Sequence, residues 1–247
     1  DDVKEIFPSL DVNIDYIKVK YNTLINSDII LREFTLNARN KQYKACLFFV
    51  DGMVNIDLVN NYVLKPLMLR NTANSFDGNQ NQVISEAVTN NITVRKVRKF
   101  DIKEYILNSL LPQNNVKQKK EFKDIFFDTI DIAFEIDVKG FRTRSVSKPE
   151  NEVVIRGPQE AFVENIRINT TLIRRIINNE NLIVESLKIG KVSQTMCALC
   201  YMKNIANDDL VAEAKYRLNN INIDYLISSG QLEQLIEDNS KYSLPQI

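Results

Sequence analysis

The sequence feature that most constrains the fold is an internal repeat with an offset of 152 residues. At this offset, residues 13–64 align with residues 165–216 without a gap, so that Glu33 aligns with Glu185 and Asn55 with Asn207. Few positions are identical, but each copy is predicted to form a helix, two strands and a second helix, in that order. A pattern that recurs in the same register is typical of an internal duplication. We therefore expect two regions of similar plan.

The first copy has the patterning of an amphipathic helix followed by a hairpin. Its helix has one apolar face, for which we take Asp11 as the N-cap. Strands are predicted at residues 29–36 and 43–50, joined by a polar connection at 37–42. Asn55 is the expected N-cap of the next helix, which Pro66 should end or kink. The residues of the first apolar face are Ile14, Ile17, Tyr21 and Leu24.

The second copy repeats this order. A long helix is expected from Pro158 through Asn178, with strands at 182–189 and 195–202 and a helix capped by Asn207. The inner side of the long helix is predicted to carry Phe162, Ile166, Ile173 and Ile177, and its outer side Arg167, Arg174 and Arg175. A short helix at 231–237 should follow.

The segment between the copies also contains regular elements. We expect a helix at 82–89, a strand at 92–97, a helix from Asp101 to Pro112, and a hairpin at 122–127 and 132–138. Residues 148–152 are polar and include Pro149, which is typical of a connector. The predicted fold class is mixed α/β. We expect two subdomains, residues 1–148 and 149–247, each a small mixed sheet packed with helices.

Composition excludes several classes of function. Lys and Arg number 32 and so do Asp and Glu, which gives no global attraction to nucleic acid. The sequence has neither a signal-peptide pattern nor an apolar run of about 18 residues, so we expect a soluble chain. There is no histidine, which removes the commonest general base and most zinc sites. With no glycine-rich phosphate motif either, we predict no catalytic residue, no metal and no cofactor.

The three cysteines lie in predicted apolar strands. Cys197 and Cys200 have the spacing of a redox or zinc motif. On a strand, however, side chains three positions apart point to opposite faces, and no histidine is present to complete a zinc site. We interpret Cys46, Cys197 and Cys200 as buried structural thiols in a reducing compartment.

Two arginine-containing segments are candidate ligand or interface sites. Arg156 and Gly157 precede the expected start of the long helix, where free backbone N–H groups favour an anion. A tight turn with a surface salt bridge is the alternative. Arg174 and Arg175 would form a patch facing solvent or a partner. The acidic pair Asp208 and Asp209 follows the Asn207 cap, so these two residues are interpreted as first-turn carboxylates rather than as an acid–base pair.

A further pattern covers most of the chain and is most specific between residues 156 and 238. It includes Arg-Gly-Pro-Gln-Glu-Ala-Phe-Val-Glu-Asn at 156–165, Leu-Ile-Arg-Arg-Ile at 172–176 and Gly-Lys-Val-Ser-Gln-Thr at 190–195. Asn-Ile-Ala-Asn at 204–207, Ile-Glu-Asp at 236–238 and segments 30–34, 50–54 and 64–68 belong to the same pattern. In these positions the chain closely resembles the A subunits of GerA-type spore germination receptors.

The resemblance implies a non-enzymatic role in sensing nutrient germinants, in receptor assembly or in signal relay at the spore inner membrane. It implies a longer membrane subunit of which this chain is the N-terminal part, on the cytoplasmic (core) side. The implied partners are a transporter-like B subunit, a lipoprotein C subunit, further A subunits and a small-molecule germinant. Two alternatives stay open: direct binding of an amino acid or sugar in an interdomain cleft, and a phosphate- or nucleotide-handling enzyme acting at Arg156.

Overall fold

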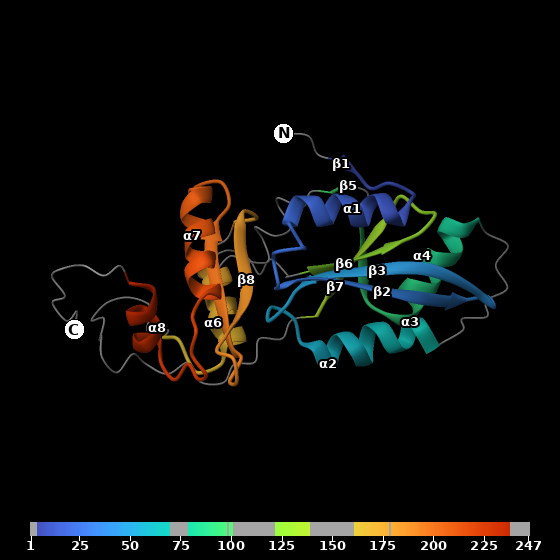
Figure 1. Cartoon of the computed structure of the whole chain (residues 1–247). Coiled ribbons are helices and arrows are strands. Elements are labelled where there is room, and N and C mark those ends of the chain that lie inside the picture. The colour runs from blue at the N-terminus through green and yellow to red at the C-terminus, as the bar shows by residue number, and fades with distance from the viewer. Residues whose placement is uncertain are drawn as a thin grey trace, which may run out of the picture. The chain divides into compact units, whose positions relative to one another are not determined.

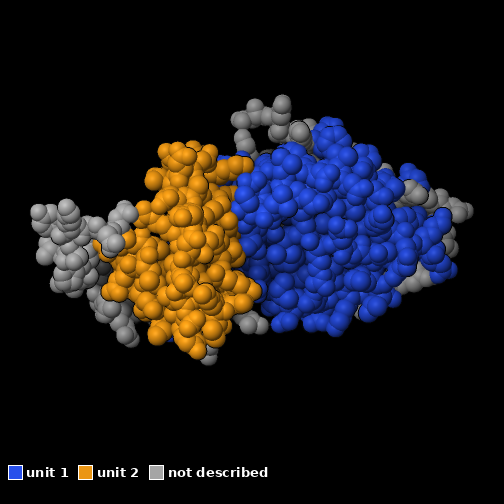
Figure 2. Space-filling model, in the orientation of Figure 1, with its two compact units in different colours: residues 1–182 blue, residues 183–247 orange. Residues whose placement is uncertain are grey.

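A computed structural model describes residues 4–69, 79–97, 99–100, 122–138, 161–177 and 179–237. The chain divides into two compact units, residues 1–182 and residues 183–247, which Figure 2 colours separately. The boundary expected near residue 149 and the helix expected from Asp101 to Pro112 lie outside the described residues. The domain division at residue 149 therefore stays a prediction. The predicted fold class, mixed α/β, is confirmed.

Unit 1 is built on a five-stranded sheet. Its strand order is β2-β3-β6-β7-β4, and all four pairings are antiparallel. The strands are β2 (Ile29–Ala38), β3 (Lys41–Val50), β4 (Val94–Val97), β6 (Phe122–Phe127) and β7 (Ala133–Asp137). A separate two-stranded sheet joins β1 (Lys4–Glu5) to β5 (Lys99–Phe100).

Helices cover both faces of this sheet (Figure 1). The α1 helix (Leu10–Tyr21) covers one face. The other face is covered by a continuous segment made of α2 (Ile56–Leu58), the π-helix η1 (Val59–Leu64) and α3 (Lys65–Leu69), and by α4 (Gln80–Asn91). The apolar residues accordingly form two clusters, one on each face of the sheet.

Strand β3 supplies both clusters because successive side chains on a strand point to opposite faces. Ala45, Leu47 and Phe49 belong to the cluster under η1, α3 and α4, whereas Cys46 and Phe48 belong to the cluster under α1. All six residues from Ala45 to Val50 are buried. The prediction that this strand is buried on both faces is confirmed.

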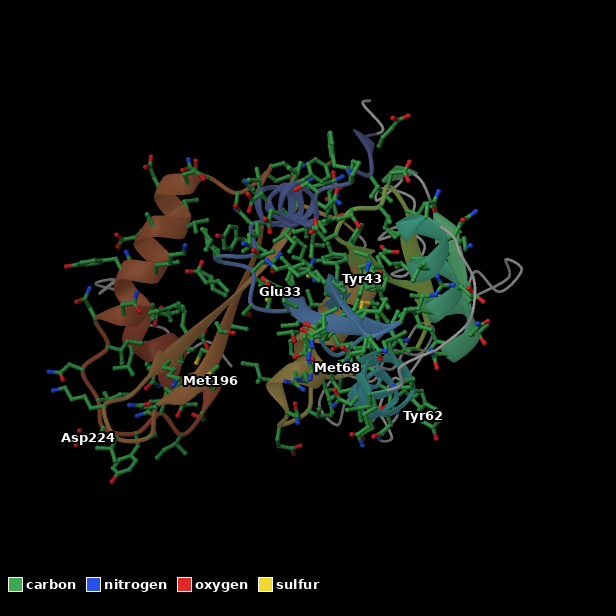
Figure 3. All side chains as sticks on the ribbon, turned by 90° about the vertical axis from the view of Figure 1, so that its right-hand side faces the viewer. Glu33, Tyr43, Tyr62, Met68, Met196 and Asp224 are labelled. Atoms are coloured by element: carbon green, nitrogen blue, oxygen red, sulfur yellow. The ribbon has the colours of Figure 1, made fainter. Side chains whose placement is uncertain are left out.

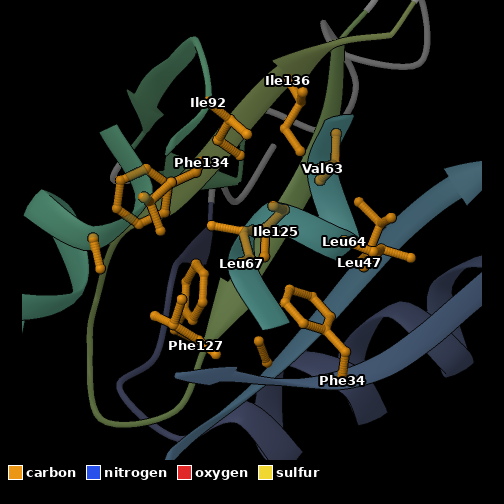
Figure 4. Packing of buried hydrophobic residues seen from close by; sticks show 14 of the residues in the cluster. Phe34, Leu47, Val63, Leu64, Leu67, Ile92, Ile125, Phe127, Phe134 and Ile136 are labelled. Carbon is orange, nitrogen blue, oxygen red and sulfur yellow. The ribbon is translucent and has the colours of Figure 1, made fainter. Parts of the chain in front are cut away.

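Aromatic side chains organise the larger cluster (Figure 4). The ring of Phe127 lies 6.3 Å from the ring of Phe34 and 5.5 Å from that of Phe134, in both cases edge to face. These three residues come from β6, β2 and β7. Edge-to-face pairs place the positive ring edge against the negative ring face, which adds to the free energy gained by burial.

Two details of the first copy differ from the sequence prediction. The strands of the first hairpin are longer than expected, because Arg39 and Asn40 alone form the turn, with φ angles of 51° and 58°. A two-residue turn with positive φ at both positions has a backbone twist that matches the right-handed twist of the flanking strands. Asp11 is not the N-cap: Ser9 holds that position and Asp11 lies in the first turn. Leu24 follows the helix and is 97% exposed, not part of its buried face.

Pro66 is accommodated without ending the helix. It is the second residue of α3, directly after the π-helix η1. Proline lacks the N–H group that would bond within an α-helix, and a wider π turn is one way to absorb such a defect. The predicted cap of this segment is confirmed, since the Asn55 side chain accepts hydrogen bonds from Asp57 N and Leu58 N. Figure 3 shows Tyr62 of η1 and Met68 of α3, which are both exposed.

The helix of the second copy begins later than expected. The α6 helix runs from Ile166 to Ile176, with Asn165 as its N-cap, whereas the prediction began at Pro158. Phe162 therefore precedes the helix and is exposed, so its predicted place on the inner side is wrong. The α6 helix belongs to unit 1.

Unit 2 contains the second hairpin and two helices. Strands β8 (Leu182–Ile189) and β9 (Thr195–Met202) and helices α7 (Asp208–Asn219) and α8 (Ser229–Ile236) confirm the predicted elements, including the Asn207 cap. The hairpin turn is held by Asp224, labelled in Figure 3, whose carbonyl accepts from Val192 N and Ser193 N. Gly190 has φ +90°, and a Cβ there would crowd the Asp224 carbonyl, so glycine is required.

Candidate functional site

The most unusual polar site in the described residues is a buried ion pair between Arg174 of α6 and Asp28, which directly precedes β2. Arg174 is 2% exposed and Asp28 is 7% exposed. Arg174 Nε donates to Asp28 Oδ2 at 2.7 Å and its Nη2 donates to Asp28 Oδ1 at 2.8 Å. Two-point pairing of arginine with a carboxylate is stronger and more specific in direction than a single contact.

Asn26 completes the network. Its Oδ1 accepts from Arg174 Nη2 at 2.9 Å, and its Nδ2 donates to the carbonyls of Tyr21 and Leu182 at 3.2 and 3.3 Å. Asn26 is 1% exposed, so these bonds satisfy groups that water does not reach. We call Asn26, Asp28 and Arg174 the Arg174 network. It joins the end of α1, the start of β2, α6 and the first residue of β8.

Two further contacts place α6 at the open end of the first hairpin. Arg167 Nη2 lies 2.9 Å from Asp51 Oδ2, and this pair is more exposed than the Arg174 pair. Gly52 has φ +82°, and a Cβ there would collide with Oγ1 of Thr171. Arg167, Thr171 and Arg174 are spaced four and three residues apart, which places them on one face of the helix. That face contacts the segments that flank β2 and β3.

The structure corrects the prediction for Arg174. We expected it to face solvent or a partner, but it is buried and paired with a residue 146 positions away in the sequence. Arg174 lies away from the apolar residues of the predicted helix, so we expected it to face outward. Its partner Asp28 is brought close only by the tertiary structure, which the helical pattern does not show. Arg175, the adjacent residue, is half-buried. Arg156 and Gly157 lie outside the described residues, so the anion site stays a prediction.

A second ion pair lies near the C-terminal end of α1. Lys20 Nζ is 3.4 Å from Glu180 Oε2 and lies 5.8 and 5.9 Å from the ring centres of Tyr16 and Tyr21. Burial raises the pKa of the Tyr21 hydroxyl well above its ordinary value, and the charges of Glu180 and Asp124 act in the same direction. Tyr21 is therefore neutral, and its role is to pack against Phe48 at 5.3 Å.

Unit 2 has its own polar contact between hairpin and helix. Lys215 Nζ of α7 lies 2.6 Å from Glu185 Oε2 of β8, and the hydroxyl of Tyr201 is 3.4 Å from the same oxygen. The hydrogen bond with Glu185 raises the pKa of Lys215. Burial raises the pKa of Tyr201, against the effect of the Lys215 charge. These groups hold α7 on the hairpin, with Lys215 charged and Tyr201 neutral at pH 7.

The cysteines are in strands, as predicted. Cys46 is fully buried, whereas Cys197 and Cys200 are half-buried, so burial of all three is wrong in degree. In the described part of the chain no group of three His, Cys, Asp or Glu side chains could hold a metal ion. None of the helices that the structure describes is long and apolar enough to cross a membrane.

The repeat is visible in one unexpected pair of residues. Asn13 accepts a hydrogen bond from Phe7 N and donates to Phe7 O, and Asn169 makes the same two bonds with Val163. Each asparagine thus joins its helix to the backbone six residues earlier. The offset of these equivalent residues is 156, that is, 169 minus 13, whereas Asn55 and Asn207 keep the offset of 152. The gapless alignment is therefore wrong by about one helical turn in the first helix.

Comparison with known proteins agrees with this architecture. The family model described as Bacillus/Clostridium GerA spore germination protein matches residues 15–247. Spore germination protein KA of Bacillus subtilis is 30% identical over 97% of this chain and 41% of its own length. Spore germination protein B1 of the same organism is 29% identical over 98% of this chain and 47% of its own length. The chain thus spans less than half the length of these relatives.

A solved structure is also similar. It is the N-terminal domain of the A subunit of the Bacillus megaterium spore germinant receptor GerK3, with a TM-score of 0.66 and 28% identity. The match covers 100% of this chain and 85% of that one. The chain belongs to the GerA family of spore germination proteins.

Proposed function

We propose that this chain is the N-terminal part of a germination receptor A subunit, and that it relays a germinant signal to the membrane portion by the relative positions of its two units. The observation that supports this proposal is the Arg174 network. It joins residues 21–28 to residues 174–182, which are far apart in the sequence, and Leu182 is the first residue of the strand that continues into unit 2. A network that fixes the segment connecting the two units is suited to transmit a signal from one unit to the other.

The energetics of burial support a positional role. Removing two charges from water costs several kcal/mol, and replacing a buried ion pair by apolar residues is often neutral or stabilising. Stability alone is therefore a weak reason for an arginine at this place. A bidentate pair with an added asparagine fixes distance and direction more tightly than apolar packing does. We infer a non-enzymatic role for these residues.

The proposed setting is an inference that the germination-receptor relatives support. We infer that the full-length protein acts at the spore inner membrane together with a transporter-like B subunit and a lipoprotein C subunit, and that this chain lies on the cytoplasmic side. Self-association of A subunits and contact with a germinant belong to the same proposal.

The test uses spores that carry the full-length A subunit with Arg174→Lys. Lysine keeps the charge but loses the two-point geometry, because its ammonium is a point donor. We expect a strong loss of the nutrient response at an unchanged amount of A subunit, measured by immunoblot. Arg167→Lys is the matched control, since its pair with Asp51 is more exposed and uses a single N–O contact that lysine can keep.

A normal response with Arg174→Lys would contradict the relay proposal. Calorimetric titration of the isolated chain with amino acids and sugars addresses direct binding. Heats of binding that saturate would assign germinant recognition to this chain itself and would replace relay as its main role. The absence of heats across a broad panel, with a defective Arg174→Lys spore, is the result that we expect.

A further inference from the structure

The α6 helix belongs to the second copy by sequence and to the first unit by contacts. In the repeated plan each hairpin is preceded by a helix, and α1 covers the hairpin that follows it: Ile14, Ile17 and Tyr21 lie in one cluster with Cys46 and Phe48. By the same plan α6 precedes β8 and β9. Its residues Arg174 and Arg167, however, form ion pairs with Asp28 and Asp51, in the segments that flank β2 and β3.

The contacts of α6 with unit 1 use positions that α1 leaves exposed. At the offset of 156 defined by Asn13 and Asn169, Arg167, Thr171 and Arg174 correspond to Asp11, Asp15 and Lys18. These three residues of α1 are exposed, and Lys18 pairs only weakly with Asp15, at 3.8 Å. In the part of the chain that the structure describes, the polar stripe of α6 is therefore paired with the carboxylates of Asp51 and Asp28, whereas in α1 its ion pair is the weak contact between Lys18 and Asp15.

The acceptors of this stripe lie together at the open end of the first hairpin. Asp51 N donates to Asp28 O at 2.7 Å, next to the first residue pair of β2 and β3, Ile29 with Val50. The two carboxylates thus flank the same end of the sheet. Asp28 receives Arg174 and Asp51 receives Arg167, so the helix is fixed near both of its ends.

We propose that the Arg174 network transfers α6 from the second copy to the first, so that α6 opens and closes as part of unit 1 and the pivot between the units lies after Leu182. Asn26 defines this point because its Nδ2 holds the carbonyl of Leu182, the last residue of unit 1. This inference goes beyond the proposed relay and does not depend on it.

Hydrogen exchange of the whole 247-residue chain, followed by mass spectrometry at increasing low concentrations of denaturant, tests the proposal. Amides of a cooperative unit open together, with one common dependence on denaturant. We expect the exchange rates of the α6 amides to depend on denaturant concentration in the same way as those of β3, and not as those of β9. If α6 follows β9, or opens by itself before either, the proposal is overturned. This comparison needs no substitution, so it stands even if a variant fails to fold.

Arg174→Lys provides the causal test. We expect the protection factors of α6 to fall by about tenfold or more, while those of β3 change by less than about threefold. Arg167→Lys, the matched control on the same helix face, should change the protection of α6 by less than about threefold, because lysine can keep the single, partly exposed contact with Asp51. Unchanged protection of α6 in Arg174→Lys would contradict the assignment. A loss of protection with a normal spore response would leave it intact and contradict only the relay.

Discussion

The two hairpins of the repeat, β2–β3 and β8–β9, have the same predicted plan but differ in how their second strands are buried. In β3 the last six residues are all buried, whereas none of the eight residues of β9 is. Strand β3 lies between β2 and β6 in a five-stranded sheet with helices on both faces. Among the strands that the structure describes, β9 pairs only with β8. Burial of a hydrophobic strand therefore depends on the neighbours that it acquires, not on its own composition.

The largest expected effect comes from matched leucines in these two strands. Leu47 in β3 is 0% exposed, and Leu199, which is 152 positions later, is half-buried in β9. Leu47→Ala should lower the free energy of unfolding by about 2–5 kcal/mol, because it leaves a cavity among fixed neighbours. Leu199→Ala should cost less than about half as much, since fewer contacts are lost. Urea denaturation measures both; equal losses would contradict the difference in burial.

The next comparison concerns the equivalent asparagines of α1 and α6. Asn13 is fully buried, and alanine there leaves the N–H and carbonyl of Phe7 without their partner. We expect Asn13→Ala to cost about 1–3 kcal/mol. Asn169→Ala should cost less, because Asn169 itself is half-buried, whereas Asn13 is fully buried, and water can more easily replace its amide. Thermal denaturation followed by circular dichroism measures the two losses of stability. A larger loss for Asn169→Ala would contradict the prediction that the more buried asparagine contributes more.

A smaller and equal effect is expected at the caps that keep the 152-residue offset. Asn55 and Asn207 each accept backbone hydrogen bonds at a helix N-terminus. Replacing either by alanine should cost about 1 kcal/mol, and replacing either by aspartate should cost almost nothing. Because both caps are local features, the two losses should agree within error. A difference of more than about 1 kcal/mol would show that tertiary contacts act at one cap.

The last comparison changes reactivity rather than the free energy of unfolding at pH 7. Burial, followed by the charge of Glu33, raises the pKa of the Cys46 thiol from 9.0 to about 12. Since the thiolate is the reactive form, iodoacetamide at pH 8 should modify Cys197 and Cys200 in the folded chain well before Cys46. Mass spectrometry of peptides identifies the modified sites. Early modification of Cys46 would show that β3 opens more readily than β9.

The same pKa predicts a pH dependence of stability. Cys46 stays protonated in the folded chain at a pH at which an unfolded thiol already ionises, so folding binds a proton there. The stabilisation is present in full below pH 9 and is lost as the pH rises from 9 towards 12. Cys46→Ser removes this ionisation and should flatten the decline over that range.

Local signals made most of the elements predictable. Both strands of the second hairpin and the Asn55 and Asn207 caps lie where the sequence placed them, because alternation, turns and caps are short-range effects. The start of α6 was misplaced by eight residues, from Pro158 to Ile166. Pro158 is a favourable first helical residue, but Asn165 is a better N-cap, and its side chain accepts from Arg167 N and Ile168 N.

The candidate site was only half visible in the sequence. Arg174 was recognised as a residue of interest, but its partners Asn26 and Asp28 were not. It was predicted to be exposed, and it is buried. A carboxylate directly before a buried strand was the available signal. The partner of this carboxylate is a helix residue that lies 146 positions later in the sequence, and a local sequence pattern cannot predict a contact between residues so far apart.

The sequence by itself determined the mixed α/β class, the repeated order of elements, and membership in the GerA family, because these follow from residue patterns that act over a few positions or that relatives share. The tertiary structure alone decided that β3 is buried where β9 is not, and that α6 is held by unit 1. Both outcomes depend on contacts between distant segments. Their free energy is gained only when those segments meet, so no single stretch of the sequence encodes them.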